Sequence, residues 1–177
     1  ISPDIEKLSV GDKKLDIFLE GGLLIRSNNL LLGPPGDEKL LFSLQFIEEG
    51  LKKGEPAVII TADDLPKDIE KKALSYKWSL ENKRNTNLLT FIDCYSWTLG
   101  KGIEEDRKDI LIQGPNALND LSLAISQTVS SLSRPGKPIR ICFNSLSTFL
   151  LYNPKESIFK FIQITGARLK IMGATSI

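Results

Sequence analysis

Short apolar runs alternate with longer amphipathic segments through most of this chain, and this alternation restricts the possible folds more than any other feature. The continuous, mostly β-branched run Ala57-Val58-Ile59-Ile60-Thr61 is typical of a strand in a parallel sheet that is covered on both faces. Similar runs predict strands at Asn29–Leu32, Leu88–Ile92, Ile139–Phe143 and from Ala174 onward. Helical spacing predicts helices over Leu15–Glu20, from Leu40 to Gly50 or Gly54, from Pro66 to about Leu74, over Leu118–Leu132 and over Ile158–Ile171. The predicted fold is therefore α/β: a doubly wound, mainly parallel sheet between two layers of helices.

The size of the chain suits one core. With 177 residues, 41% of them hydrophobic, residues 1–177 are expected to form a single domain. The sequence begins at Ile1 rather than at a methionine, and it stops four residues into the strand predicted from Ala174. We therefore expect a piece of a longer protein, truncated at its C-terminus.

Several classes of site and location are excluded by composition. There is no histidine, so histidine triads, histidine general bases and histidine metal sites are ruled out. Cys94 and Cys142 lie in apolar segments without C-x-x-C spacing, which favours buried thiols in a reducing compartment over a disulfide or a zinc site. No apolar run approaches the roughly 18 residues that span a bilayer, and no signal peptide opens the chain. We expect a soluble cytoplasmic protein with no metal site and no membrane partner.

Charge gives no support to nucleic-acid binding. The net charge is +1, and the basic residues are interleaved with acidic ones. Lys52-Lys53 and Lys71-Lys72 are typical of solvated helix surfaces, and the charged stretch from Gly100 to Asp109 is typical of a surface loop. Nucleic acid is not expected to be a partner.

An altered phosphate-binding loop follows the apolar run at Leu30–Leu32. In the motif G-x-x-x-x-G-K-[ST], the second glycine lets backbone amides close around phosphates, the lysine reaches the β- and γ-phosphates, and the hydroxyl ligates Mg²⁺. Gly33, Gly36 and Lys39 are present, but Glu38 replaces the second glycine of the motif and Leu40 replaces the magnesium ligand. These residues are interpreted as a vestigial P-loop.

The acidic residues of this loop add to the disruption. Asp37 and Glu38 begin a predicted helix, so they place two carboxylates where a triphosphate needs positive potential. For Lys39 two interpretations are open. It either retains some phosphate binding, or it is an ordinary first-turn lysine held by Asp37, Glu38 or a neighbouring carboxylate.

Five segments, taken in their order and spacing, carry a resemblance that covers nearly the whole chain: Val10-Gly11-Asp12-Lys13-Lys14-Leu15-Asp16, Gly21-Gly22-Leu23, Gly33-Pro34-Pro35-Gly36, Gln45 to Glu55, and Asn144-Ser145-Leu146-Ser147. Together they resemble the RecA/KaiC-like P-loop ATPase family, in particular its archaeal KaiC-like branch. The resemblance implies a RecA-like three-layer α/β/α fold. It also implies a Walker A motif Gly-Pro-Pro-Gly-Thr-Gly-Lys-Thr, a pair of acidic residues after the second strand, and a Walker B aspartate at the end of the fourth.

The resemblance places two further groups at altered positions. Asp63 and Asp64 stand at the acidic pair and are vestigial catalytic candidates that could polarise water, although each is one methylene shorter than glutamate. Their alternative role is to cap the helix that begins near Pro66. Asn144 stands at the Walker B position, where its amide brings no negative charge to magnesium. It either contacts a ligand or satisfies nearby backbone.

These alterations predict a catalytically inactive RecA/KaiC-like domain that acts as a regulatory or protein-interaction module without ATP turnover or cofactor. Phosphoryl transfer depends on positioning and on charge neutralisation by Mg²⁺, and both are affected here. The alternative is a weak ATP-binding protein or ATPase with a remodelled P-loop, using ATP and Mg²⁺, in signal transduction or as a recombinase paralogue.

The expected partner is a protein or peptide, or a second copy of the chain that associates through a sheet edge. In the RecA-like strand order that the resemblance implies, the strand from Ala174 lies beside the strand Asn29–Leu32. Unpaired backbone groups along that edge would accept an added strand.

Overall fold

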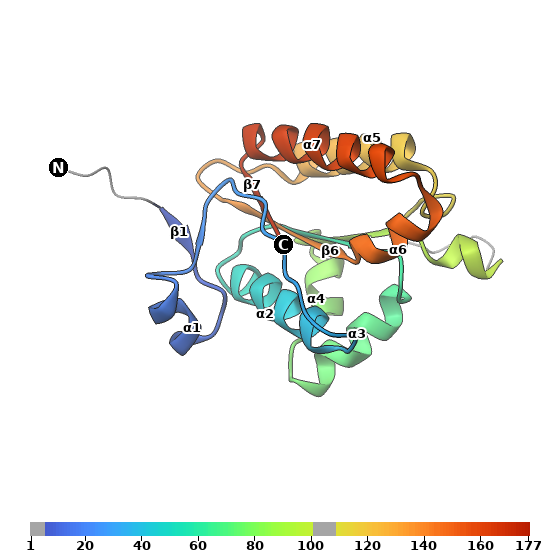
Figure 1. Cartoon of the computed structure of the whole chain (residues 1–177). Coiled ribbons are helices and arrows are strands. Elements are labelled where there is room, and N and C mark those ends of the chain that lie inside the picture. The colour runs from blue at the N-terminus through green and yellow to red at the C-terminus, as the bar shows by residue number, and fades with distance from the viewer. Residues whose placement is uncertain (1–5, 101–108) are drawn as a thin grey trace.

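The computed structural model describes residues 6–100 and 109–177 and places a parallel sheet at the centre of the molecule (Figure 1). The sheet has five strands in the order β5-β4-β3-β6-β7. Their bounds are β3 Ala57–Thr61, β4 Leu89–Asp93, β5 Ile110–Leu111, β6 Ile139–Asn144 and β7 Ala174–Ser176. Every pairing between neighbours is parallel, which confirms the predicted α/β fold.

Helices cover both faces of the sheet. On one side lie α2 (Glu38–Lys52), α3 (Pro66–Ser75) and α4 (Leu80–Asn85), and on the other lie α5 (Leu118–Leu132) and α7 (Lys155–Ile171) (Figure 1). The short helices α6 (Leu146–Tyr152) and η1 (Ser96–Leu99) follow β6 and β4. The arrangement is the three-layer α/β/α architecture that the resemblance implied.

A small unit formed by the N-terminal residues packs beside α2. Strands β1 (Lys7–Leu8) and β2 (Leu23–Leu24) pair antiparallel around α1 (Lys13–Phe18). The side chain of Gln45 in α2 donates from Nε2 to the carbonyl of Gly11 at 2.8 Å, and Val10 is fully buried. The unit is therefore joined to the main domain by both packing and hydrogen bonding.

The alternation of side chains along β3 divides the interior into two cores. Val58 and Ile60 belong to the cluster under α5 and α7, whereas Ala57 and Ile59 belong to the cluster under α2, α3 and α4. All four are fully buried, because a strand in the middle of a covered parallel sheet has no solvent face. Because both faces of β3 are covered, its sequence shows no alternation of polar and apolar residues.

Both cysteines are free and buried in these cores, as expected. Burial raises the pKa of the Cys94 thiol to about 12, with a further contribution from Asp93. Burial also raises the pKa of the Cys142 thiol to about 12. Neither thiol is a nucleophile near neutral pH, since the thiolate is the reactive form.

The strand expected at Asn29–Leu32 is not formed, and that prediction was wrong in extent. The structure has only an isolated parallel bridge between Asn28 and Ser176, although this does place the segment beside β7 as the resemblance implied. Within the described chain no strand lies beside residues 30–32, and Leu30 and Leu32 are exposed instead of buried. An apolar run alone does not form a strand without a pairing partner.

Other differences are smaller. The helices α4, α6 and η1 and the two-residue strands β1, β2 and β5 were not predicted from the sequence. The surface loop expected from Gly100 to Asp109 falls mostly on residues 101–108, which lie outside the described residues. In the described part of the chain, no helix is long and apolar enough to cross a membrane.

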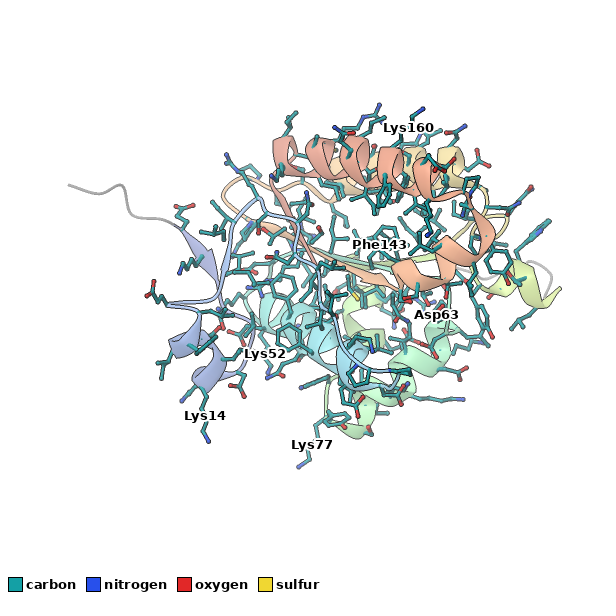
Figure 2. The ribbon with its side chains drawn as sticks, in the orientation of Figure 1. Lys14, Lys52, Asp63, Lys77, Phe143 and Lys160 are labelled. Carbon is teal, nitrogen blue, oxygen red and sulfur yellow. The ribbon has the colours of Figure 1, made fainter. Side chains whose placement is uncertain are left out.

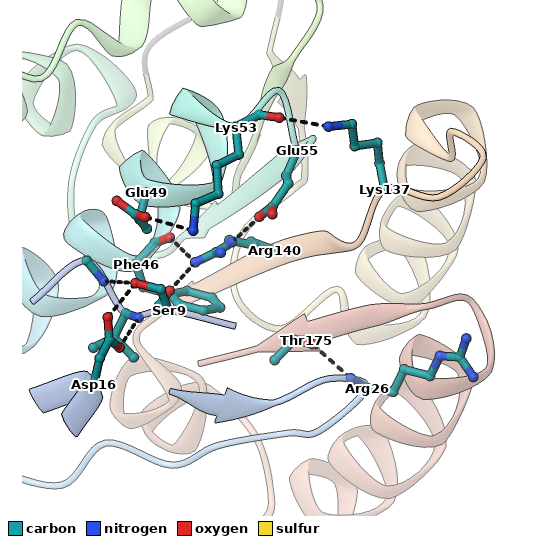
Figure 3. Close-up of polar contacts among 12 residues, drawn as sticks. Ser9, Asp16, Arg26, Phe46, Glu49, Lys53, Glu55, Lys137, Arg140 and Thr175 are labelled. Atoms are coloured by element: carbon teal, nitrogen blue, oxygen red, sulfur yellow. Dashed lines mark hydrogen bonds and ion pairs between the residues drawn. The ribbon is translucent and has the colours of Figure 1, made fainter. Parts of the chain in front are cut away.

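A fully buried arginine in β6 joins distant segments on the α2 side of the sheet (Figure 3). Arg140 Nε donates to the Glu55 carboxylate at 2.6 Å. Its Nη1 donates to the carbonyls of Ser9 at 2.6 Å and of Phe46 at 2.9 Å. The guanidinium also lies 4.6 Å from the centre of the Phe46 ring. One side chain therefore holds together the N-terminal unit, α2, the loop before β3 and the central sheet.

The close passage of this arginine explains a glycine inside α2. A Cβ added at Gly50 would overlap Cδ and Nε of Arg140 and approach the carboxylate of Glu55 within 2.8 Å. Glycine costs a helix interior roughly 0.5–1 kcal/mol relative to alanine. Here that cost makes room for a buried ion pair.

Besides Glu55, the structure has a buried acid within α2, Glu48, whose surroundings satisfy it less well. Glu48 is 7% exposed, and its Oε2 has no hydrogen-bond partner among the described residues. Burial raises the pKa of this carboxyl, and the nearby cations Lys52 and Lys83 offset only part of the effect. Folding therefore disfavours the charged form of Glu48.

We expect Glu48→Gln to raise the free energy of unfolding at neutral pH by about 1 kcal/mol, because it removes a poorly solvated charge while keeping the side-chain shape. Because folding raises the pKa of Glu48, the protonated carboxyl stabilises the folded state at pH values below its unfolded pKa. This stabilisation is lost as the pH rises through the pKa of the folded state. The advantage of the variant should therefore grow from pH 4 to pH 7 in urea denaturation. The control is Glu49→Gln, which removes an acid 2.8 Å from Lys53 and should be neutral or slightly destabilising. A Glu48→Gln variant that gains nothing over this pH range would show that water solvates the carboxylate.

Candidate functional site

The strand register brings the polar residues at the carboxyl ends of β3 and β6 together. Thr61, the last residue of β3, is paired with Asn144, the last residue of β6. The backbone N–H of Ala62 then donates to the Asn144 carbonyl at 2.8 Å. Because Asp63 and Asp64 follow at once, the acidic pair and the Walker B position meet at one edge of the sheet, where parallel α/β folds bind ligands.

The side chain of Asn144 acts on this acidic pair. Its Nδ2 donates to Oδ2 of Asp64 at 3.1 Å. The hydroxyl of Thr61 donates to the Asp64 carbonyl at 2.7 Å, which orders the turn that carries the carboxylate. The expectation that Asn144 satisfies backbone with its side chain was therefore wrong, since its amide contacts a carboxylate.

Asp63 is held by two hydroxyls from the start of α6. Ser145 Oγ donates to Asp63 Oδ2 at 2.8 Å, and Thr148 Oγ1 donates to Asp63 Oδ1. Figure 2 shows Asp63 between α6 and the helices on the opposite side of the sheet. The predicted capping of α3 by an aspartate was wrong, because the N-cap residue is Leu65 and no side chain caps that end.

The loop of residues 33–39 turns two of its side chains back onto itself. Lys39 Nζ donates to the carbonyl of Pro34, and the lysine stem packs over Gly33. The Glu38 carboxylate lies against Gly36, where a Cβ would overlap it. The expectation that Lys39 is held by a carboxylate was therefore wrong, since its partner is a main-chain oxygen of the loop.

Asp37 links the loop to the helix after the acidic pair. Its Oδ1 accepts a hydrogen bond from Lys72 Nζ of α3 at 2.7 Å, and its side chain does not cap α2. The Asp37 side chain is 67% exposed, so this ion pair contributes little stability. It nevertheless ties the P-loop to the segment that carries Asp63 and Asp64.

Leu40 contributes no polar group to this site. It is 6% exposed and belongs to the core cluster on the α2 side of the sheet, with Leu44 and Ile47. Leucine at this position therefore extends the apolar face of α2 by one position. Within the described residues, no cluster of three or more His, Cys, Asp or Glu side chains is placed to hold a metal ion.

Comparison with families of known proteins matches residues 8–177 to the family described as "ATPase: KaiC". The chain belongs to the KaiC ATPase family. A UPF0273 protein of Methanopyrus kandleri is 29% identical over 174 residues, covering 98% of this chain and 66% of that protein. The circadian clock oscillator protein KaiC of Prochlorococcus marinus is 28% identical over 183 residues, covering 100% of this chain and 33% of that protein. The chain thus spans about two thirds of the length of its UPF0273 relative.

The Mg²⁺ and ATP that this family name implies do not fit the residues present. A P-loop needs a hydroxyl at the position of Leu40 and free backbone amides around the phosphates. Leu40 is in the core, Glu38 lies against the loop, and Asn144 offers an amide at the position where the resemblance implied a carboxylate.

Sequence reasoning missed four polar residues around the site. Ser145 and Thr148 hold Asp63, Lys72 holds Asp37, and the buried Asp93 accepts from the N–H of Ser96 at 2.9 Å at the end of β4. The signal for Ser145 and Thr148 was present, since hydroxyls at one and four residues after Asn144 share the first turn of a helix. The pairing of Lys72 with Asp37 crosses between elements, and no local pattern indicates it.

Proposed function

We propose that this KaiC-family domain no longer turns over ATP and acts as a regulatory or protein-interaction module. The observation that carries the proposal is the closure of the P-loop on itself: Lys39 donates to the Pro34 carbonyl while Glu38 lies against Gly36. Lys39, the side chain that would meet a phosphate, thus has a partner within the chain. The amide of Asn144 on Asp64 and the hydroxyls on Asp63 extend the same pattern to the acidic pair.

The partner proposed for this module is a peptide segment, or a second copy of the chain, that adds to the sheet beside β7. On the outer side of β7, residues 27–29 form the last backbone hydrogen bonds to the sheet. The N–H of Ser176 donates to the Ser27 carbonyl, and the N–H of Asn29 donates to the Ser176 carbonyl. Beyond it, no backbone hydrogen bond joins residues 30–32 to another described segment, and Leu30 and Leu32 are 68% and 82% exposed. An extended apolar segment with free N–H and C=O groups favours strand addition. A reducing, cytoplasmic location is part of the proposal and agrees with the two free buried thiols.

The second candidate is a weak nucleotide-binding protein or ATPase with a rebuilt site. It is favoured by family membership and by Gly33 and Lys39, which keep their motif positions. Under this proposal Lys39 would have to exchange the Pro34 carbonyl for a phosphate, and Glu38 would have to leave the loop.

Isothermal titration with ATP, with and without Mg²⁺, separates the two candidates. We expect no dissociation constant tighter than about a millimolar, because Asp37 and Glu38 repel the triphosphate and no magnesium ligand offsets them. Mg²⁺ should make no difference to the heat. A micromolar, Mg²⁺-dependent dissociation constant would establish the second candidate and overturn the first.

A further inference from the structure

A groove runs between α5 and α7 on the outer side of the helical layer, away from the vestigial nucleotide site. It has a volume of about 820 Å³, and residues from both helices line it. Phe161 is nearly buried at its base, while Leu123 on α5 and Ile164 on α7 are 58% and 51% exposed. Apolar side chains therefore remain open to solvent on the two sides of a concave surface.

The lining has the spacing and length that suit a docked helix. On α7 it includes Ser157, Phe161, Ile164 and Arg168, which are separated by four, three and four residues. This stripe spans 12 residues, from Ser157 to Arg168, or roughly 16 Å of helix. The groove can therefore contact about three turns of a helical partner.

The surface between the apolar residues is made of small polar side chains. Ser122 and Ser126 of α5 line it, and Ser122 Oγ lies 3.4 Å from Thr165 Oγ1 of α7. Short side chains at this point let a partner helix approach closely, so that its own apolar residues reach Leu123 and Ile164.

Charge indicates the nature of the partner. Lys160 and Arg168 line the groove eight residues apart on α7, and neither forms an ion pair with a described residue. Figure 2 shows Lys160 on the outer side of the layer. The lining contains one acid, Asp120. The same face of a second copy would bring like charges together, and a concave surface suits a helix better than a flat bilayer.

We propose that the α5–α7 groove binds an acidic amphipathic helix of a partner protein. Its apolar residues, spaced by three and four positions, contact Leu123, Phe161 and Ile164. Its carboxylates, about two turns apart, pair with Lys160 and Arg168, whose Cα atoms are separated by roughly 12 Å along α7. This rests on the interaction role proposed above and gives that role a second surface with a defined partner chemistry.

The test uses a fluorescein-labelled synthetic amphipathic helix of about five turns, with leucines at three- and four-residue spacing and glutamates two turns apart. Fluorescence anisotropy should give a dissociation constant on the order of 10 µM, and a scrambled peptide of the same composition should bind at least about tenfold more weakly.

The double variant Lys160→Glu/Arg168→Glu should weaken binding at least about tenfold, and a peptide with lysines in place of the glutamates should bind this variant better than it binds the original chain. The matched control is Lys155→Glu/Lys170→Glu, which makes the same charge change on α7 outside the groove and should leave affinity within about twofold. Circular dichroism melts confirm that both double variants fold.

Three outcomes would overturn the proposal: equal binding of the scrambled peptide, equal loss in the two double variants, or no charge-swap rescue. Binding to phosphatidylglycerol vesicles that is lost only in the groove variant would assign the surface to a lipid membrane and would also overturn it. The ATP titration is independent of all these results, so failure of the groove leaves the proposed loss of nucleotide turnover standing, and tight ATP binding leaves the peptide result standing.

Discussion

Replacing Glu55 with alanine is expected to lower the free energy of unfolding by about 3–5 kcal/mol, because it leaves the Arg140 guanidinium buried without a counter-charge. Arg140 is fully buried and Glu55 is 7% exposed, so water cannot take the place of the carboxylate. The hydrogen bonds from Arg140 to the Ser9 and Phe46 carbonyls remain, but they do not neutralise the charge. Guanidinium denaturation with circular dichroism detection measures the loss.

The control is a partly exposed ion pair in the same region, Lys53 with Glu49 at 2.8 Å, which Figure 3 shows beside the buried one. Glu49→Ala should cost no more than about 0.5 kcal/mol, as is usual for pairs four residues apart on a helix. If Glu55→Ala cost as little as this control, Arg140 would have to be solvated, and its assigned role in joining the N-terminal unit to the sheet would be wrong.

Combining Glu38→Gly, Leu40→Thr and Asn144→Asp is expected to produce Mg²⁺-dependent ATP binding at least about a hundredfold tighter than that of the original chain. The three changes remove the carboxylate from the loop, supply the magnesium hydroxyl and supply the Walker B charge. Two new charge-assisted contacts at about 1.5–3 kcal/mol each account for a change of that size. Isothermal titration at constant Mg²⁺ measures it.

Each single reversion should fall short of this effect, because magnesium needs both the hydroxyl and the carboxylate. Leu40→Thr should also lower stability by about 1–3 kcal/mol, since Leu40 is 6% exposed in the core of α2. Asn144→Asp alone should place a second charge beside Asp64 and weaken the contact now made by the amide. A folded triple variant that binds ATP no better than the original chain would show that further residues block the site.

The sequence predicted best those elements whose own pattern of polar and apolar residues shows which of their faces are buried. The prediction for Ala57–Thr61 agrees with β3 because a doubly covered strand has no polar face, and Leu118–Leu132 agrees with α5 because one helix face is buried. The approach of Asn144 to Asp64 was not predicted, and it arises because the neighbouring parallel strands β3 and β6 end at the same edge of the sheet.

The interactions that the sequence could not predict join residues across elements. The partner of Lys39 is a carbonyl five residues earlier, and main-chain oxygens carry no sequence signal. Arg140 is a charge within an apolar strand that was not singled out from the sequence, and its partners Glu55, Phe46 and Ser9 precede it by 85, 94 and 131 residues. Asn29–Leu32 has the composition of a strand, and only the described sheet shows that no neighbour pairs with residues 30–32.

The separation of Glu55 and Arg140 along the chain also affects how the protein folds while the ribosome is still synthesising it. Arg140 follows Glu55 by 85 residues. At roughly 5–20 residues per second, the ribosome takes about 4–17 seconds to add the residues between Glu55 and Arg140. Once β4 has been added within that interval, β3 of the nascent polypeptide has β4 on one side and still lacks β6 on the other. The emerging N-terminal half therefore presents an apolar strand edge and an uncompensated acid, and we expect it to depend on chaperones until the arginine arrives.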